Sequence, residues 1–187
     1  DSNVIQYTTS RCPPVLDIIF TDVRNCVEIN NFILREVERL QPTQVFLHAA
    51  WQSYNQNTVL NVEKTIRNIK EVSPTTHIVV VGSVPQWKPT LPIYAIRRGI
   101  SLNKEHYLLM QRYKSIANVD KNLIKLSTMN GVTFLSALKD LCVNDNCLAV
   151  VWHEKAYELT AFDSGHLTEA GSIFLAKKLL EKLNSDY

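Results

Sequence analysis

The sequence predicts an α/β fold in which helices cover both faces of a parallel sheet, and three observations support this. Residues 44–50 and 77–82 are near-continuous apolar runs, as expected of strands that are buried on both faces. Helical patterns follow both runs, and another apolar run lies at 132–135. Because strands that alternate with helices favour parallel pairing, we expect one mostly parallel sheet.

The first part of the chain contains the signals for one further strand and two helices. Residues 4–8 are β-branched and aromatic and predict a strand. Asn25 can cap a helix that runs to about Leu40, where Pro42 stops it. A second helix is predicted for residues 58–72, ahead of a Ser-Pro stop.

The second part of the chain is less regular in pattern. Residues 83–99 contain three prolines and no periodicity, which predicts a long loop of the kind that is often functional. A helical segment is predicted for residues 103–129, with a break near Asn118. Residues 132–135 are then expected to form the last strong strand.

In a parallel sheet of this type, ligands bind beyond the carboxyl ends of the strands. The loops beginning at Cys12, Trp51, Ser83 and Ser136 are expected at that edge. A candidate site is therefore expected where these loops meet.

Composition narrows the possible functions. The chain has 187 residues, is 45% hydrophobic and 20% charged, and is predicted to form a single domain over residues 1–187. The net charge of +2, with both signs interspersed, suggests neither a nucleic-acid stripe nor a polybasic membrane patch. No apolar run is long enough to span a bilayer. The chain begins Asp1-Ser2-Asn3, without Met or a signal peptide, so we expect it to be part of something longer.

Four cysteines form two local groups, Cys12 with Cys26 and Cys142 with Cys147. Four cysteines allow three pairings, and the sequence does not choose among them. Each group brackets a turn-rich segment, so we favour local disulfides and an oxidising compartment such as the periplasm. Four reduced, buried thiols are the alternative. Since neither group has zinc-ligand spacing supported by histidines, no metal site or other cofactor is predicted.

The most informative short segment is the turn that contains Asp163 and His166. Gly165 can adopt positive φ and turn the chain back, which would bring the carboxylate to the imidazole Nδ1. That contact would fix the tautomer and leave Nε2 free to accept a proton from a nucleophile. Thr168 is expected to cap the amphipathic helix that follows. A surface histidine before a capped helix is the alternative.

Residues 162–171 resemble the C-terminal catalytic block of SGNH hydrolases. More narrowly, the chain resembles the SGNH domain fused behind acyltransferase-3 membrane proteins that O-acetylate bacterial surface polysaccharides. The matching segments span nearly the whole chain in order: residues 5–14, Cys26, residues 45–54, residues 79–85, and Cys142 to Cys147.

The resemblance implies a three-layer, flavodoxin-like α/β/α fold and a Ser-His-Asp mechanism. It assigns Asp163 as the orienting acid and His166 as the base. The family's nucleophile lies in a Gly-Asp-Ser motif after the first strand. Asp1 and Ser2 match two of its letters, but only Asn3 separates them from the next predicted strand. We therefore expect the first strand and the nucleophile upstream, and residues 1–187 to be inactive alone.

Substrate-binding candidates lie in two of the loops. Four aromatic residues are candidates for stacking on a sugar ring, with a role as buried loop anchors as the alternative: Trp51, Tyr54, Trp87 and Tyr94. Asn55 or Gln52 is a candidate oxyanion donor, because their loop stands where many relatives have Gly-x-Asn-Asp.

The resemblance also implies the partners and the location. The partners would be a glycan acceptor, an acyl donor and an acyltransferase-3 membrane domain in the same full-length protein, on the periplasmic side of a bacterial inner membrane. Neither nucleic acid nor a membrane span within this chain is expected. A secreted carbohydrate esterase and a non-catalytic glycan-binding or partner-docking module remain as alternatives, since fold alone does not determine function.

Overall fold

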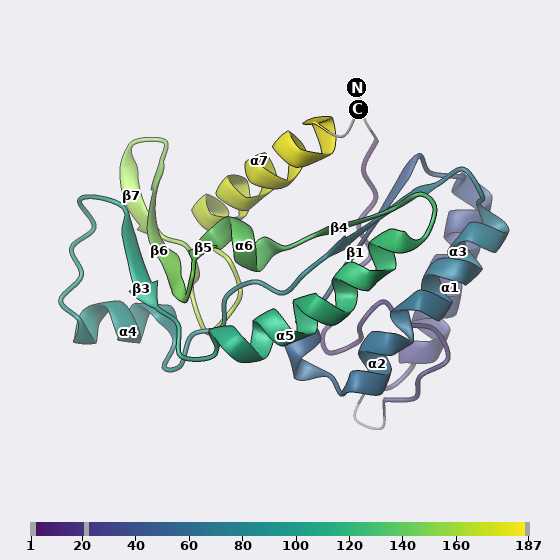
Figure 1. Cartoon of the computed structure of the whole chain (residues 1–187), viewed down its shortest axis with the longest axis horizontal. Coiled ribbons are helices and arrows are strands. Elements are labelled where there is room, and N and C mark those ends of the chain that lie inside the picture. The colour runs from purple at the N-terminus through teal and green to yellow at the C-terminus, as the bar shows by residue number, and fades with distance from the viewer. Residues whose placement is uncertain (1–2, 21–22, 186–187) are drawn as a thin grey trace. The chain divides into compact units, whose positions relative to one another are not determined.

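The computed structural model describes residues 3–20 and 23–185, which form two compact units (Figure 1). The first unit consists of Asp1–Val81 with Lys121–Phe134, and the second of Gly82–Asp120 with Leu135–Tyr187. The prediction of a single domain stays a prediction.

A parallel sheet forms the centre of the first unit. Strand β1 (Gln44–His48) pairs in parallel with β2 (His77–Val81), and β4 (Val132–Leu135) lies on the other side of β2. The central strand is the most buried, because three successive residues after His77 are fully inaccessible to solvent. The predicted α/β class with parallel strands is therefore confirmed.

The helices of the first unit agree closely with the periodicity of the sequence. Helix α1 (Cys26–Leu40) has the predicted bounds and packs against α3 (Val62–Val72). The helix predicted for residues 58–72 is in fact two, because α2 (Gln56–Leu60) ends before α3 begins. Two short 3-10 helices, η1 (Trp51–Ser53) and η2 (Ile124–Thr128), complete the unit, together with the end of α5 (Tyr113–Leu123).

The strand predicted for residues 4–8 is wrong. This segment has no strand pairing, and Val4 and Ile5 are 86% and 56% exposed. The Tyr7 hydroxyl instead donates a hydrogen bond to Glu36 on α1 over 3.2 Å. Local β-propensity favours an extended chain, but a strand also requires a neighbouring edge to pair with.

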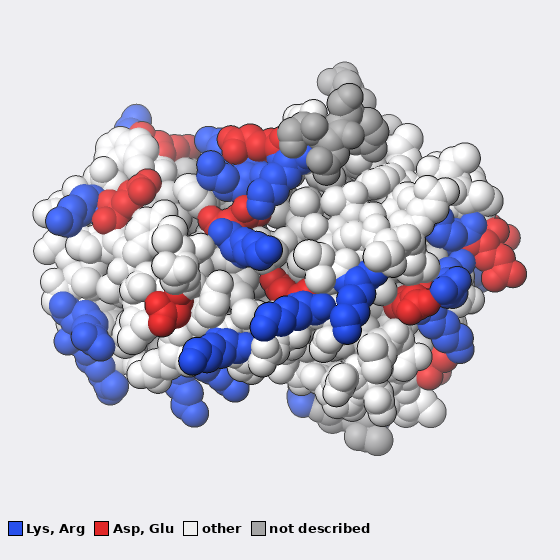
Figure 2. Space-filling model, viewed as in Figure 1, with Lys and Arg blue, Asp and Glu red and all other residues white. Residues whose placement is uncertain are grey.

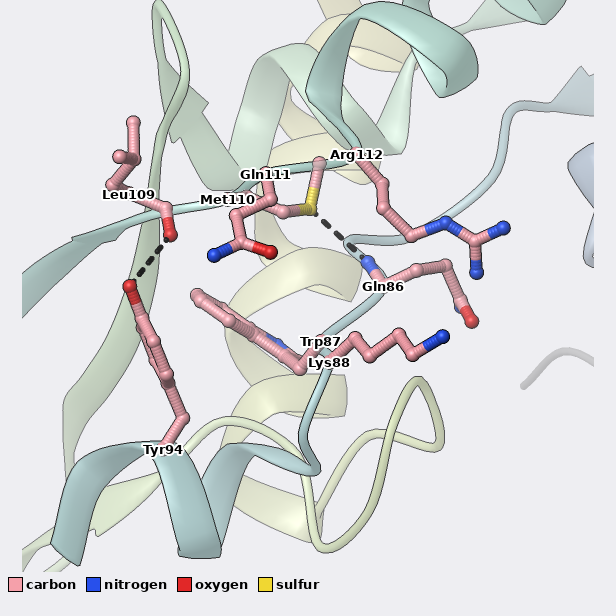
Figure 3. Close-up of a pocket in the computed structure, with 8 residues that line it drawn as sticks. All are labelled: Gln86, Trp87, Lys88, Tyr94, Leu109, Met110, Gln111 and Arg112. Atoms are coloured by element: carbon pink, nitrogen blue, oxygen red, sulfur yellow. Dashed lines mark hydrogen bonds between the residues drawn. The ribbon is translucent and has the colours of Figure 1, made fainter. Parts of the chain in front are cut away.

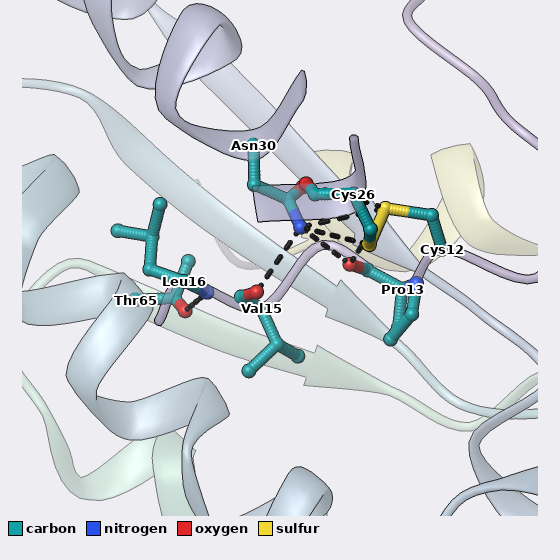
Figure 4. The surroundings of a disulfide bond; sticks show 7 residues. All are labelled: Cys12, Pro13, Val15, Leu16, Cys26, Asn30 and Thr65. Atoms are coloured by element: carbon teal, nitrogen blue, oxygen red, sulfur yellow. Dashed lines mark hydrogen bonds between the residues drawn. A yellow bond between two sulfur atoms is a disulfide. The ribbon is translucent and has the colours of Figure 1, made fainter. Parts of the chain in front are cut away.

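A disulfide between Cys12 and Cys26 ties the N-terminal loop to α1 (Figure 4). Beside it, the amide of Asn30 donates to the carbonyl oxygens of Pro13 and Val15, each over 3.0 Å. Because Asn30 is buried, these bonds satisfy polar groups that water does not reach. The loop is therefore fixed by covalent and polar contacts together, and the predicted local pairing of the cysteines is confirmed.

The second unit is built on antiparallel strands. Its longest strand, β6 (Asn146–His153), pairs with β3 (His106–Leu109), β5 (Cys142–Val143) and β7 (Ala156–Leu159). The second disulfide joins Cys142 and Cys147, which face each other across β5 and β6. Thus both predicted disulfides are present.

Three predictions for this part of the chain are wrong. Residues 83–99 contain a helix, α4 (Leu91–Arg97). Pro92 does not interrupt this helix, because it lies in the first turn, where a missing N–H is tolerated. The segment predicted to be helical over 103–129 contains β3 before α5 begins. Residues 132–135 are also not the last strong strand, since β6 follows them.

Helices α6 (Ala137–Leu141) and α7 (Glu169–Ser185) pack against each other and against β6. Thr168 caps α7 as predicted, because its Oγ1 accepts the N–H of Gly171 over 3.2 Å. A Cβ at Gly171 would lie 2.1 Å from the carbonyl oxygen of Thr160, so only glycine fits there. The start of α7 is thus held directly against the segment that leads into the Asp163 turn.

The surface carries both signs of charge. Figure 2 shows Lys and Arg interspersed with Asp and Glu over the visible face, as the composition predicted. Among the residues that the structure describes, no helix is long and apolar enough to cross a membrane. In the same part of the chain, no group of three or more His, Cys, Asp or Glu is placed to hold a metal ion.

We predict that the Cys12–Cys26 disulfide contributes more to stability than the Cys142–Cys147 disulfide. Cys12 and Cys26 are 14 residues apart in the sequence, whereas Cys142 and Cys147 are 5 apart, so the first disulfide closes the longer loop. By loop-closure entropy, replacing both cysteines with serine should cost about 3 kcal/mol for the first pair and about 2 kcal/mol for the second. Urea denaturation of the two double variants would measure this, and the reverse order would contradict it.

Candidate active site

The side chains of Asp163 and His166 are in direct contact, as the sequence predicted. Nδ1 of His166 lies 2.6 Å from Oδ2 of Asp163. The other carboxylate oxygen, Oδ1, accepts the backbone N–H groups of Gly165 and His166, each over 2.8 Å. Because an ionised carboxylate only accepts hydrogen bonds, Nδ1 carries a proton, and in the neutral ring the lone pair is therefore on Nε2. The side chain of His166 is 78% exposed, so Nε2 is accessible.

The same contacts keep Asp163 ionised. Desolvation alone would raise the pKa of its carboxyl group. The N–H groups of Gly165 and His166, followed by the imidazole, outweigh this effect and lower the pKa to about 2. The carboxylate therefore stays charged at any pH at which a histidine base would work.

An aromatic ring supports the imidazole from one side. The ring of Phe162 is stacked on that of His166, with centroids 5.6 Å apart and planes inclined by 13°. The N–H of Phe162 also donates to the carbonyl oxygen of His166 over 3.1 Å. Phe162 is nevertheless 62% exposed. No separate role was predicted for Phe162 from the sequence, although an aromatic residue directly before the aspartate is a visible signal.

The segment that follows β2 holds the turn in place. The N–H of Trp87 donates to the carbonyl oxygen of Ser164 over 2.7 Å, and that of Leu91 to Asp163 over 3.1 Å. The side-chain amide of Gln86 lies against Gly165, where a Cβ would be 2.0 Å from its Nε2. Gly165 does not have positive φ, so the predicted reason for a glycine here is wrong. Close packing against Gln86 is the reason.

Trp87 lines a small pocket beside this segment (Figure 3). It is only 4% exposed and packs beside Tyr94, whose hydroxyl donates to the carbonyl oxygen of Leu109 over 3.2 Å. The pocket volume of about 10 Å³ is enough for a water molecule but not for a sugar ring. The complete lining consists of Gln86, Trp87, Lys88, Tyr94, Leu109, Met110, Gln111 and Arg112.

The other predicted substrate-binding residues belong to the first unit, where each has a structural partner. Trp51 is fully buried, and its Nε1 donates to the carbonyl oxygen of Val81 over 2.8 Å. Tyr54 packs edge-on against Phe20, and the side-chain oxygen of Asn55 caps α2. A fully buried ring offers no free face to a sugar, so Trp51 has no place in our proposed site.

A buried carboxyl group, that of Asp120 on α5, lies where the segments after β2 and β4 begin. It accepts a short hydrogen bond from Ser136, which follows β4 and caps α6. Gly82, directly after β2, leaves room for the carboxyl group, because a Cβ there would lie 2.6 Å from Oδ1. Burial raises the pKa of Asp120 to about 6, against the lowering effects of Ser136 and Ser83. No motif or spacing in the sequence predicts this buried carboxyl group.

We predict that Gly165→Ala destabilises the fold by about 1 kcal/mol, because the new methyl group would displace the Gln86 amide. Truncation of that amide should make room for the methyl group. In a Gln86→Ala background the same substitution should therefore cost much less, as a double-mutant cycle of urea denaturation would show. An equal cost in both backgrounds would contradict the packing argument.

We also predict that Asp120 makes stability fall as the pH rises from about 4 to about 6. Since its folded pKa is higher than the unfolded value of 3.8, the folded state binds more protons in this range. The unfolding free energy of Asp120→Asn minus that of the wild-type chain should therefore be about 2 kcal/mol larger at pH 7 than at pH 4. Chemical denaturation at both values measures this gain, and a constant difference between the two proteins would rule it out.

Comparison with known proteins supports the resemblance. The family model of the SGNH domain (fused to AT3 domains) matches residues 1–181. The periplasmic domain of a lipopolysaccharide acetyltransferase from Salmonella ser. Paratyphi A is 27% identical, with a TM-score of 0.71. That match covers 92% of this chain and 69% of the Salmonella chain. No curated protein matches the sequence.

A second solved structure shows a likeness of fold alone. It is a protein from Streptococcus pneumonia, provisionally described as a platelet activating factor, with 18% identity and a TM-score of 0.51. The match covers 75% of this chain and 59% of that one. The family match extends over nearly the whole chain, and the architecture agrees with it. This protein therefore belongs to the family of SGNH domains that are fused to AT3 domains.

Proposed function

We propose that this chain is the extracytoplasmic SGNH-type domain of an O-acyltransferase that transfers acetyl or other acyl groups to a cell-surface glycan. The observation that carries the proposal is the 2.6 Å contact between Asp163 and Nδ1 of His166, with Nε2 directed to solvent. Family membership and the similarity to a lipopolysaccharide acetyltransferase domain support it. Two disulfides favour an oxidising location such as the periplasm.

In the proposed mechanism, His166 moves protons and Asp163 keeps its ring oriented. Nε2 takes the proton of a serine hydroxyl while the serine oxygen bonds to the acyl carbonyl carbon of the donor. The bond between the acyl group and the donor breaks, and the leaving group takes the proton from Nε2. A sugar hydroxyl then gives its proton to Nε2 while its oxygen bonds to the acyl carbon of the acyl-serine, and the bond from that carbon to the serine oxygen breaks as the serine takes the proton back from Nε2.

We place the nucleophile in a segment that precedes Asp1, because the family's Gly-Asp-Ser motif does not occur within residues 1–187. Asp1 and Ser2 lie outside the described residues, so the structure says nothing of their placement. We accordingly propose that residues 1–187 alone have little or no activity. The membrane acyltransferase domain to which such domains are fused would be the partner that delivers the acyl group.

Two other functions fit the same family. In a secreted esterase, water would accept the acyl group in place of a sugar. In a binding module, the fold would hold a glycan or a partner without catalysis. The ordered Asp163–His166 pair favours catalysis, since a binding module has no need for an oriented imidazole.

The test uses a longer polypeptide that includes the preceding segment, assayed on p-nitrophenyl acetate with and without a glycan acceptor. His166→Ala should lower the ester turnover at least about a thousandfold, because the base is lost. Asp163→Asn should have a similarly large effect through the wrong tautomer. Acylated glycan among the products would identify a transferase, and acetate alone an esterase.

His153→Ala is the matched control. Its Nδ1 also lies near a carboxylate, that of Glu158, at 3.2 Å, but it belongs to the β6–β7 hairpin. This variant should retain turnover. If His166→Ala retains turnover as well, or if the longer chain is inert toward both ester and glycan, the catalytic proposal fails.

A further inference from the structure

One face of α4 and the loop after it expose apolar side chains beside cations. Ile93 and Ile96 on the helix are 44% and 79% exposed, and Leu102 in the loop is 53% exposed. Arg97 and Lys104 are exposed cations of the same segment. We call these five residues, Ile93, Ile96, Arg97, Leu102 and Lys104, the α4 surface.

Helical periodicity explains why these apolar side chains face solvent. Ile93, Ile96 and Arg97 are spaced i, i+3 and i+4, so they share one face of α4. The opposite face carries Leu91 and Tyr94, which are both buried. Both faces of this helix therefore carry apolar side chains: one face is buried, and the other exposes Ile93 and Ile96 beside Arg97.

The end of α4 directs the following loop outward. The N–H of Gly99 donates to the carbonyl oxygen of Ile96, and that of Ile100 to Ala95, each over 3.0 Å. Gly99 has φ of +62°, and no atom lies within 4 Å of the position where its Cβ would be. Residues 101–105 are all exposed, so Leu102 has no core to enter.

Three of the four charged residues between positions 91 and 109 are cations. Arg98 is the third cation, and the Cζ of its guanidinium lies 5.4 Å from the centroid of the Tyr94 ring. Glu105 is the one acidic residue between positions 91 and 109. Among the described residues, none of the three cations forms an ion pair with a carboxylate. Figure 2 shows Lys and Arg side chains gathered where Figure 1 draws α4, at the lower left of the view.

We infer that the α4 surface binds the headgroup region of an anionic phospholipid bilayer. Aliphatic side chains beside cations suit this layer, where acyl chains and phosphates lie within a few ångströms of one another. A protein-docking surface would instead be enriched in aromatic residues and depleted in lysine. The sequence did not predict the site, because these cations do not form a polybasic run.

This inference goes beyond the proposed function and does not depend on it. Contact with the bilayer would hold the second unit, with its Asp163–His166 pair, close to the lipid surface whether or not the chain is catalytic.

The test is flotation of residues 1–187 with vesicles of phosphatidylcholine, with and without phosphatidylglycerol. We expect binding that requires phosphatidylglycerol and weakens at high salt, because counterions screen the attraction. Ile96→Ser with Arg97→Gln should lower the partition coefficient roughly tenfold or more, through loss of one apolar contact and one cation. Both residues are exposed, so the fold should be unaffected.

Ile124→Ser with Lys125→Gln provides the matched control, because it removes an exposed isoleucine–cation pair from η2 in the first unit. It should bind like the wild-type chain. A tryptophan in place of Ile96 should also show a blue-shifted emission when anionic vesicles are added.

The inference fails if the chain does not float with anionic vesicles at low salt, or if the two double variants bind equally. It also fails if neutral vesicles bind as well as anionic ones. If the α4 surface docks only onto another protein, the chain will not float with anionic vesicles. Ester turnover in the longer polypeptide is measured without vesicles, so the two proposals can fail separately.

Discussion

The site depends on one carboxylate that makes two kinds of contact. One oxygen of Asp163 accepts two backbone N–H groups and so shapes the turn, while the other holds the imidazole of His166. The geometry of the turn and the orientation of the ring are therefore coupled, since neither oxygen can move without the other. The backbone contacts also lower the pKa of the carboxyl group, which keeps the negative charge that the ring requires.

The Asp163 turn is itself held by its surroundings in the second unit. Backbone hydrogen bonds from Trp87 and Leu91 hold it on one side, and Thr168 and the tight packing at Gly171 fix the helix that follows. The segment after β2 thus acts as a brace for the turn and not as a wall of a large pocket. This explains why Trp87 is buried although it lies in a proline-rich segment.

Features that depend on short-range spacing could be predicted from the sequence. Both disulfides and the Asp163–His166 contact join residues close together in the chain, and local geometry is enough to propose them. The parallel sheet was also predictable, because buried strands are continuous apolar runs.

Features that depend on distant partners were not predictable. Strand β3 exists because it pairs with β6, some forty residues later in the chain, and residues 4–8 form no strand because they have no such partner. The burial of Trp51 and the need for glycine at 165 likewise follow from contacts with Val81 and Gln86. A single sequence carries no local signal of these neighbours.

The openness of the imidazole has a consequence for selectivity. With 78% of its side chain in contact with solvent, His166 in the proposed mechanism would activate whichever hydroxyl reached it first, and bulk water is by far the most abundant. An acyl-serine beside such a ring is short-lived unless something shields it. Fidelity toward a sugar would then be set by the lid that an incoming glycan or an adjoining domain forms over the ring, and not by the base itself.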